Sequence, residues 1–263
     1  MTMTGHRSGK VFYGWWVVLA AGVGLALHSS PIIAATFGVF FKPLSQEFGW
    51  SRAEVSLAFS LATLVGSGAV LVVGRLVDRF GARKVILPSV VLFGLGVLSL
   101  SSLSPFLWHF YALYLVLGIV GSGTTPVAYS QVISHWFDQR RGFALALAIS
   151  GSSVGAFIMP PLTQALITAV GWRQAYVVLG LLIIGGTLPV VGLLLKESPQ
   201  LMGLAPDGVP GADAGIASQH GQRQGLSGRE AWHSGVFLAD GRCVFPDLGE
   251  FPRLLYPLGA AAH

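Results

Sequence analysis

Two prolines, Pro31 and Pro126, each lie among small polar residues inside an apolar stretch of the sequence. The polar candidates around them are His28, Ser29, Thr36, Ser122, Thr125 and Tyr129. On a continuous helix, Ser29 and Thr36 share one face because they are seven residues apart. In the same way Ser122, Thr125 and Tyr129, at i, i+3 and i+7, share one face of another helix. Hydroxyls gathered in this way could donate hydrogen bonds to a small anion. Ordinary helix packing is the alternative interpretation, because serine and threonine also hold membrane helices together.

His28 is the only ionisable side chain well inside one of these apolar stretches. An ionisable group at membrane depth is a functional candidate by default. An imidazole exchanges its proton near neutral pH, so His28 is a candidate for coupling solute movement to a proton.

Other chemistries find little support in the sequence. Cys243 is the one cysteine, which excludes an internal disulfide and gives no metal-ligand spacing. We find no His-Glu-x-x-His pair and no nucleophile with a credible base, and so we expect no enzyme, metal or cofactor. The net charge of +5 comes from short basic clusters between apolar runs, so no nucleic-acid partner is expected.

The composition is that of a protein with several membrane spans. Of 263 residues, 53% are hydrophobic and only 10% are charged, against about a quarter in soluble proteins. The uncharged intervals are 11–41, 55–74, 85–137, 142–172 and 174–195. A span needs about 20 apolar residues, so the third interval holds two helices, divided by the turn signal Ser101–Pro105. The sequence therefore predicts an all-α protein with six transmembrane helices.

The loops between these spans alternate in charge. Nine basic residues lie in the segments on one side of the membrane and three in the segments on the other. Because basic residues mark the cytoplasmic side, we expect both ends of the six-helix unit to be cytoplasmic, in a multi-pass protein of the inner membrane.

The two halves of this unit resemble each other. His28–Pro31 (HSSP) corresponds to Gly123–Pro126 (GTTP), and Gly81–Arg83 (GAR) to Gly171–Arg173 (GWR), at offsets of 95 and 90 residues. Each unit has three helices, an odd number, so the second copy is inverted in the membrane. The pattern predicts a 3+3 inverted repeat.

Charge is concentrated in one segment, Gly74–Lys84 (GRLVDRFGARK), which we call the signature segment. Its residues Gly74, Leu76, Asp78, Arg79, Gly81 and Arg83 resemble the signature loop between helices 2 and 3 of the major facilitator superfamily. Gly38–Ser60, Phe137–Leu162 and Glu197–Gly208 resemble segments of its bacterial monocarboxylate-transporter-like (oxalate/formate-antiporter-like) branch.

The resemblance implies one half of a twelve-helix fold that transports a small solute by alternating access. In the family the aspartate and arginine of this loop hold it against the opposite half, so Gly74, Asp78, Arg79, Gly81 and Arg83 are candidates for a cytoplasmic gate. The alternative is that these charges only keep the loop on the cytoplasmic side of the membrane. Ala156, where drug antiporters carry proline, speaks against drug efflux, and Ala35 stands where animal monocarboxylate carriers have a lysine.

We expect four regions along the chain. They are a cytoplasmic N-terminus (1–10), the six-helix bundle (11–195), a cytoplasmic linker approaching a seventh helix (196–238), and a non-native or disordered tail (239–263). The tail carries charges and prolines that prevent it from spanning a bilayer, as if the chain were truncated to its N-terminal half. The expected partners are a small organic anion such as a mono- or dicarboxylate, a coupling proton, the lipid bilayer, and either a second copy or a missing C-terminal half. A half-unit that inserts without transporting, or serves only in assembly, is the alternative function.

Overall fold

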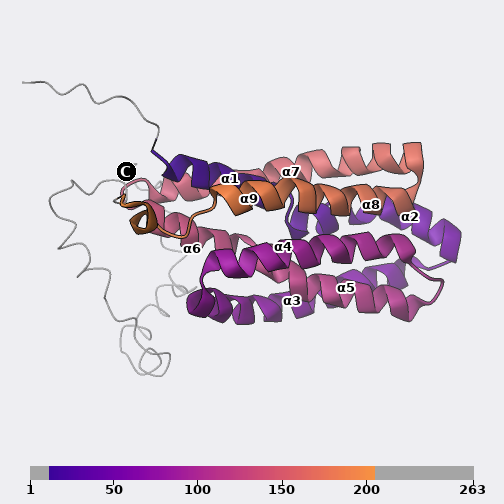
Figure 1. Ribbon diagram of the computed structural model, residues 1–263. Coiled ribbons are helices and arrows are strands. Elements are labelled where there is room, and N and C mark those ends of the chain that lie inside the picture. Colours follow the sequence, from indigo (N-terminus) through magenta and orange to yellow (C-terminus); the bar gives the residue numbers. More distant parts are fainter. Residues whose placement is uncertain (1–11, 205–263) are drawn as a thin grey trace, which may run out of the picture. The chain divides into compact units, whose positions relative to one another are not determined.

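The computed structural model describes residues 12–204, and its regular elements there are all helices (Figure 1). Six helical segments are long and apolar enough to cross a membrane: Gly14–Ala34, Arg52–Phe80, Ala82–Ser102, Leu107–Trp136, Arg141–Val170 and Trp172–Leu194. The predicted number of spans and the division of the longest uncharged interval are confirmed. The expected N-terminus, the distal linker and the tail lie outside the described residues.

Several spans are built from more than one helix. Span 1 consists of α1 (Gly14–Ala26) and the π-helix η1 (Ser30–Ala34), and α2 (Phe37–Phe48) continues it. Spans 2 and 5 are the long helices α3 (Arg52–Phe80) and α7 (Arg141–Val170). Span 3 joins α4 (Ala82–Ser99) to η2 (Leu100–Ser102), and span 4 joins α5 (Leu107–Gly121), η3 (Ser122–Thr124) and α6 (Pro126–Trp136). Span 6 joins α8 (Trp172–Leu182), η4 (Ile183–Thr187) and α9 (Leu188–Leu194), and η5 (Pro199–Met202) follows.

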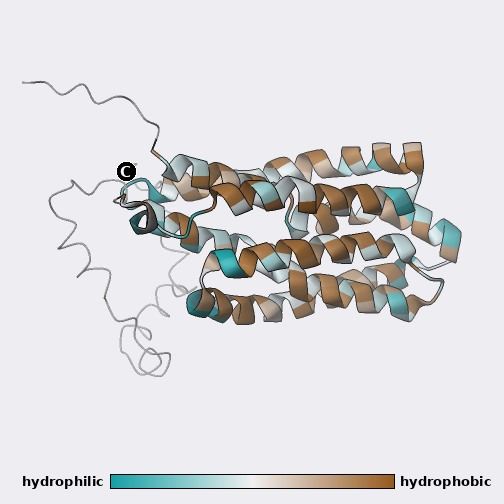
Figure 2. Ribbon diagram, in the orientation of Figure 1, coloured by the Kyte–Doolittle hydropathy of each residue, from teal (hydrophilic) through white to brown (hydrophobic). Residues whose placement is uncertain are grey.

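Along the spans the helices are mostly apolar, and hydrophilic residues gather toward the helix ends (Figure 2). Large side chains such as Leu64, Phe157 and Leu193 are exposed there. In water such a surface would be costly, whereas a bilayer solvates it, so the pattern is that of a membrane protein.

Span 2 extends beyond the interval expected from charge alone. Ser51 and Glu54 form a capping box that starts α3, and the helix continues through Asp78 to Phe80. Most of the signature segment is therefore helical, and only Gly81 separates α3 from α4. A charged residue ends the apolar stretch of a sequence but does not end a helix, which is why the two boundaries differ.

The predicted inverted repeat appears in the backbone of the two tight turns. Gly81 joins α3 to α4 with φ 90° and ψ 148°, and Gly171 joins α7 to α8 with φ 82° and ψ 163°. Positive φ of this kind is accessible mainly to glycine, so both units need glycine at the same place.

Helix packing follows the same symmetry. Spans 1, 2 and 3 correspond to spans 4, 5 and 6. The pair α1–α7 in spans 1 and 5 therefore corresponds to the pair α5–α3 in spans 4 and 2, and the helices of both pairs approach closely. A Cβ on Gly151 would lie 2.2 Å from the Gly22 carbonyl oxygen, and one on Gly118 would lie 2.3 Å from that of Ala62. Only small residues let helix backbones approach this closely. The pair α4–α8 in spans 3 and 6 corresponds to itself, and there Gly94 and Gly180 each face the carbonyl of the other.

At the end of the bundle that carries the signature segment, which we call the signature end, side chains from other spans donate to carbonyls in the last turn of α9 and just after it. Trp136 Nε1 donates to the Lys196 carbonyl at 2.8 Å, Tyr13 Oη donates to that of Leu194 at 3.3 Å, and Arg83 donates to that of Gly192. The last carbonyls of a helix have no partner within it, so these donors fix the point where the chain leaves span 6.

At the opposite end, Arg173 joins three segments. Its guanidinium pairs with Glu47 at 2.6 Å and donates to the carbonyls of Ser101 and Leu103. The indole of Trp172 also donates to the Glu47 carboxylate. The end of α2, the turn between spans 3 and 4, and the start of α8 are thereby held together.

Candidate functional site

Spans 1 and 4 are both interrupted beside their prolines. Pro31 has no amide hydrogen to donate, and the chain around it forms the π-helix η1. In span 4, Thr125 is extended (φ −75°, ψ 162°) between η3 and α6, and Pro126 starts α6. The two interruptions touch, because the Ser29 amide donates to Thr124 Oγ1 at 3.3 Å.

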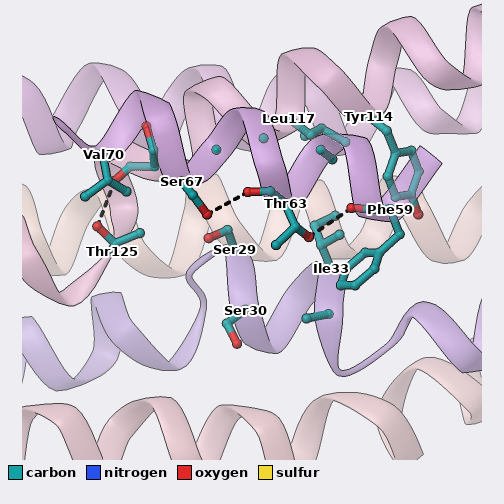
Figure 3. Close-up of a pocket in the computed structure, with 15 residues that line it drawn as sticks. Ser29, Ser30, Ile33, Phe59, Thr63, Ser67, Val70, Tyr114, Leu117 and Thr125 are labelled. Atoms are coloured by element: carbon teal, nitrogen blue, oxygen red, sulfur yellow. Dashed lines mark hydrogen bonds between the residues drawn. The ribbon is translucent and has the colours of Figure 1, made fainter. Parts of the chain in front are cut away.

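A cavity of about 300 Å³ lies beside these interruptions, between spans 1, 2 and 4 (Figure 3). Its lining residues are Ser29, Ser30, Ile33, Ala34, Phe59, Ala62, Thr63, Gly66, Ser67, Val70, Tyr114, Leu117, Gly118, Ser122 and Thr125. The wall is mostly apolar, with hydroxyls at intervals and no charged side chain among the lining residues. Its size suits a small solute.

Several hydroxyls on this wall are already engaged as donors. Thr63 donates to the Phe59 carbonyl, Ser67 to that of Thr63, and Thr125 to that of Ser122, at 2.8–2.9 Å (Figure 3). A hydroxyl has one hydrogen, so these groups offer mainly lone pairs to the cavity.

Three of the six predicted cavity residues line this cavity. Ser29, Ser122 and Thr125 are on its wall, whereas His28, Thr36 and Tyr129 are buried and are not among its lining residues. The spacing argument assumed continuous helices, and the interruptions in both spans change which side chains share a face.

The three buried residues have local environments of their own. His28 Nδ1 lies 2.5 Å from the Leu25 carbonyl, and Thr36 Oγ1 donates to the Ile32 carbonyl. The Tyr129 hydroxyl is packed against Gly24, and the structure gives it no hydrogen-bond partner among the described residues.

The contribution of span 2 to the cavity was not predicted. Phe59, Thr63, Ser67 and Val70 line it from α3, together with Gly66. Their spacing follows the helical period, and a face of small and hydroxyl residues inside an uncharged interval was a usable signal. Within the described part of the chain, no group of histidine, cysteine, aspartate or glutamate residues could hold a metal ion.

The signature segment lines a second, more polar cavity of about 480 Å³ between α3, α6 and α7. Gly74 and Asp78 belong to its wall, and Gln131 Nε2 donates to Asp78 at 2.8 Å. The guanidinium of Arg79 lies over the Phe80 ring instead. Gly81 and Arg83 lie at the turn and in α4, so the structure brings only two of the five predicted gate residues into this cavity.

The family model described as Major Facilitator Superfamily matches residues 11–245. The chain belongs to the major facilitator superfamily. The resemblance of the signature segment is thereby confirmed, and the six helices are one half of the superfamily fold.

Relatives within the superfamily include transporters of bacteria and mammals. The chain is 30% identical over 187 residues to the uncharacterized MFS-type transporter YcxA of Bacillus subtilis, covering 70% of this chain and 45% of the relative. It is 31% identical over 215 residues to monocarboxylate transporter 13 of Bos taurus, covering 80% of this chain and 48% of the relative. With the probable sulfoacetate transporter SauU of Cupriavidus necator the identity is 29% over 157 residues, covering 59% and 36%. The chain thus spans less than half the length of these superfamily members.

Proposed function

We propose that this chain supplies one half of the solute pathway of a secondary active transporter for a small organic anion, such as a mono- or dicarboxylate. The observation that carries the proposal is the hydroxyl-lined cavity where spans 1 and 4 are interrupted. Superfamily transporters bind their solutes near the midplane, at interrupted helices of corresponding repeats. Relatives named for monocarboxylates and for sulfoacetate support an anion as the solute.

Alternating access needs a second six-helix bundle facing this cavity. We propose that a C-terminal half or a second copy of the chain covers it. We also propose that the bundle lies in the inner membrane, with both of its ends on the cytoplasmic side. The cavity wall of this chain has no cationic residue, so the charge that balances the anion would come from that second bundle.

His28 is the proposed site for a coupling proton. A carbonyl oxygen only accepts hydrogen bonds, so the contact with Leu25 places a hydrogen on His28 Nδ1. Nε2 is then the nitrogen that gains or loses the coupling proton.

Binding and uptake of labelled pyruvate, oxalate and sulfoacetate by the purified 263-residue chain test the proposal. We expect saturable binding of at least one anion to the chain in detergent, and no uptake into liposomes by a monomer, because one bundle has no opposite wall. Failure of all three anions to bind the chain in detergent would contradict the proposed solute class. Uptake by a strictly monomeric chain would contradict the need for a second bundle.

Asp78 is the proposed gate residue at the signature end. Its carboxylate is exposed and accepts from Gln131, which ties α3 to α6. In a complete two-bundle transporter, Asp78→Asn should reduce transport several-fold while the protein inserts and folds normally. Transport by Asp78→Asn at the wild-type rate would leave these charges a role in topology alone.

A further inference from the structure

The interruption of span 1 is closed by side chains. The Ser29 amide donates to Thr124 Oγ1, outside the helical ladder of its own span. The Leu25 carbonyl, four residues before Ser29, receives His28 Nδ1 instead. Because unpaired backbone groups are costly in a membrane, each of these bonds compensates for the broken ladder.

The Thr124 hydroxyl both donates and accepts a hydrogen bond in this arrangement. Its hydroxyl donates to the Gly121 carbonyl at 2.7 Å, so its lone pair must accept the hydrogen of the Ser29 amide. The side chain is 2% exposed and lies in η3, the interruption of span 4. One buried hydroxyl therefore fixes the interruption of span 1 to that of span 4.

Ser29 is where this link reaches the cavity. Its side chain points toward the α3 wall of the cavity, whereas Ser30 points the other way (Figure 3). The hydroxyls of Thr63, Ser67, Ser122 and Thr125 donate to backbone carbonyls. Across residues 12–204, the structure gives no such acceptor for Ser29, so its hydrogen is available to a solute.

We propose that Ser29 is the hydroxyl of this bundle that donates to the bound anion, and that Thr124 is the residue that positions it. This inference rests on the proposed function. An anion accepts hydrogen bonds and cannot donate them, so the four wall hydroxyls that already donate to backbone carbonyls offer it little. Thr124 holds the Ser29 backbone in place without touching the solute.

The test compares Thr124→Val, which keeps the shape but removes the hydroxyl, with Thr124→Ser, which keeps the hydroxyl. Thr168→Val, an exposed position on α7, is the matched control for a threonine-to-valine change. For whichever of pyruvate, oxalate and sulfoacetate binds the wild-type chain, we expect Thr124→Val to raise Kd by about threefold to tenfold, as losing one hydrogen bond would. Thr124→Ser and Thr168→Val should keep the wild-type Kd.

A second readout does not depend on the solute. Hydrogen exchange of the backbone segment containing Ser29 should accelerate in Thr124→Val and stay slow in Thr124→Ser. Wild-type affinity in Thr124→Val, or equal loss in Thr124→Ser, would overturn the positioning role. If no anion binds the wild-type chain, the proposed function and the donor role of Ser29 both fail. Hydrogen exchange then tests the bond between the Ser29 amide and Thr124 by itself. Unchanged exchange in Thr124→Val would overturn that bond's role as well.

Discussion

Hydrogen-bond roles of single residues explain why the cavity has its present chemistry. Serine and threonine in a helix commonly donate to the carbonyl one turn earlier, and α3 shows this at Thr63 and Ser67. The hydrogen of such a hydroxyl is used within its own helix. The wall is then polar but offers a solute no hydrogen-bond donor at these positions. Hydroxyls at the interruption of span 4 also donate to carbonyls, whereas Ser29, at the interruption of span 1, has no such acceptor within residues 12–204.

Glu47 and Arg173 give a residue-level prediction for pH. The Arg173 guanidinium, hydrogen-bonded to Glu47, holds the pKa of the Glu47 carboxyl below its ordinary value, with a smaller contribution from the Trp172 indole. A pKa that is lower in the folded state stabilises the fold above the ordinary pKa of the carboxyl, and this stabilisation is lost as pH falls through the lowered value.

Glu47→Gln should therefore lower the free energy of unfolding at pH 7 by less than about 1 kcal/mol, since the pair is partly exposed. Thermal unfolding in detergent from pH 7 to pH 3 should show the difference from wild type shrinking as Glu47 becomes protonated. Lys42→Gln, a charge change on α2 outside this network, is the control. A difference that grows toward acid pH would contradict the ion pair's contribution.

At the scale of elements, glycine determines how closely the helices approach. Gly118 in α5 faces the Ala62 carbonyl, and Gly155 in α7 faces that of Ala26, each where a Cβ would be within 2.3 Å. Backbone carbonyls cannot move aside as a side chain can, so any larger residue must separate the helices.

Gly118→Ala and Gly155→Ala should each destabilise the bundle by about 1–3 kcal/mol, the usual cost of overpacking. Gly68→Ala is the matched control on α3, because a Cβ there meets nothing within 4 Å. It should be neutral or slightly stabilising, since alanine favours a helix by about 1 kcal/mol over glycine. Thermal unfolding of the purified variants measures these effects, and equal stability of Gly118→Ala and Gly68→Ala would refute the close approach.

The sequence predicts the number of spans, their repeat and the two interruptions, because each depends on a local feature. Long uncharged intervals indicate the spans, glycines the matching turns of the repeat, and prolines the interruptions. The composition of the cavity wall could not be predicted. Thr36 and Tyr129 have the same residue types as the residues on the wall, but the interruptions rotate them into the interior. Whether a hydroxyl such as Thr63 or Ser29 has a free hydrogen depends on neighbouring carbonyls, which only the three-dimensional arrangement reveals.

At the scale of the whole molecule, an even number of spans returns the chain to its starting side. The start of α1 and the end of α9 lie at the same end of the bundle (Figure 1). The excess of basic residues at that end predicts that it is cytoplasmic.

Reporter fusions should bear out this orientation. Fusions after Lys10, Arg52, Lys84, Ser104, Arg141, Trp172 and Lys196 should alternate between the two sides of the membrane, starting inside. Two successive fusions on the same side would contradict the six-span topology.

The most direct test of the central claim, a solute pathway at the interruptions of spans 1 and 4, is cysteine labelling. Cys243→Ser removes the one native thiol, and single cysteines then replace Ser67 and Thr125 on the cavity wall, or Leu181 on the outer surface. The first two should react with a water-soluble maleimide and be protected by pyruvate, oxalate or sulfoacetate, whereas Leu181→Cys should remain unreactive. Cavity cysteines as unreactive as Leu181→Cys, or reactive but unprotected by all three anions, would contradict the account.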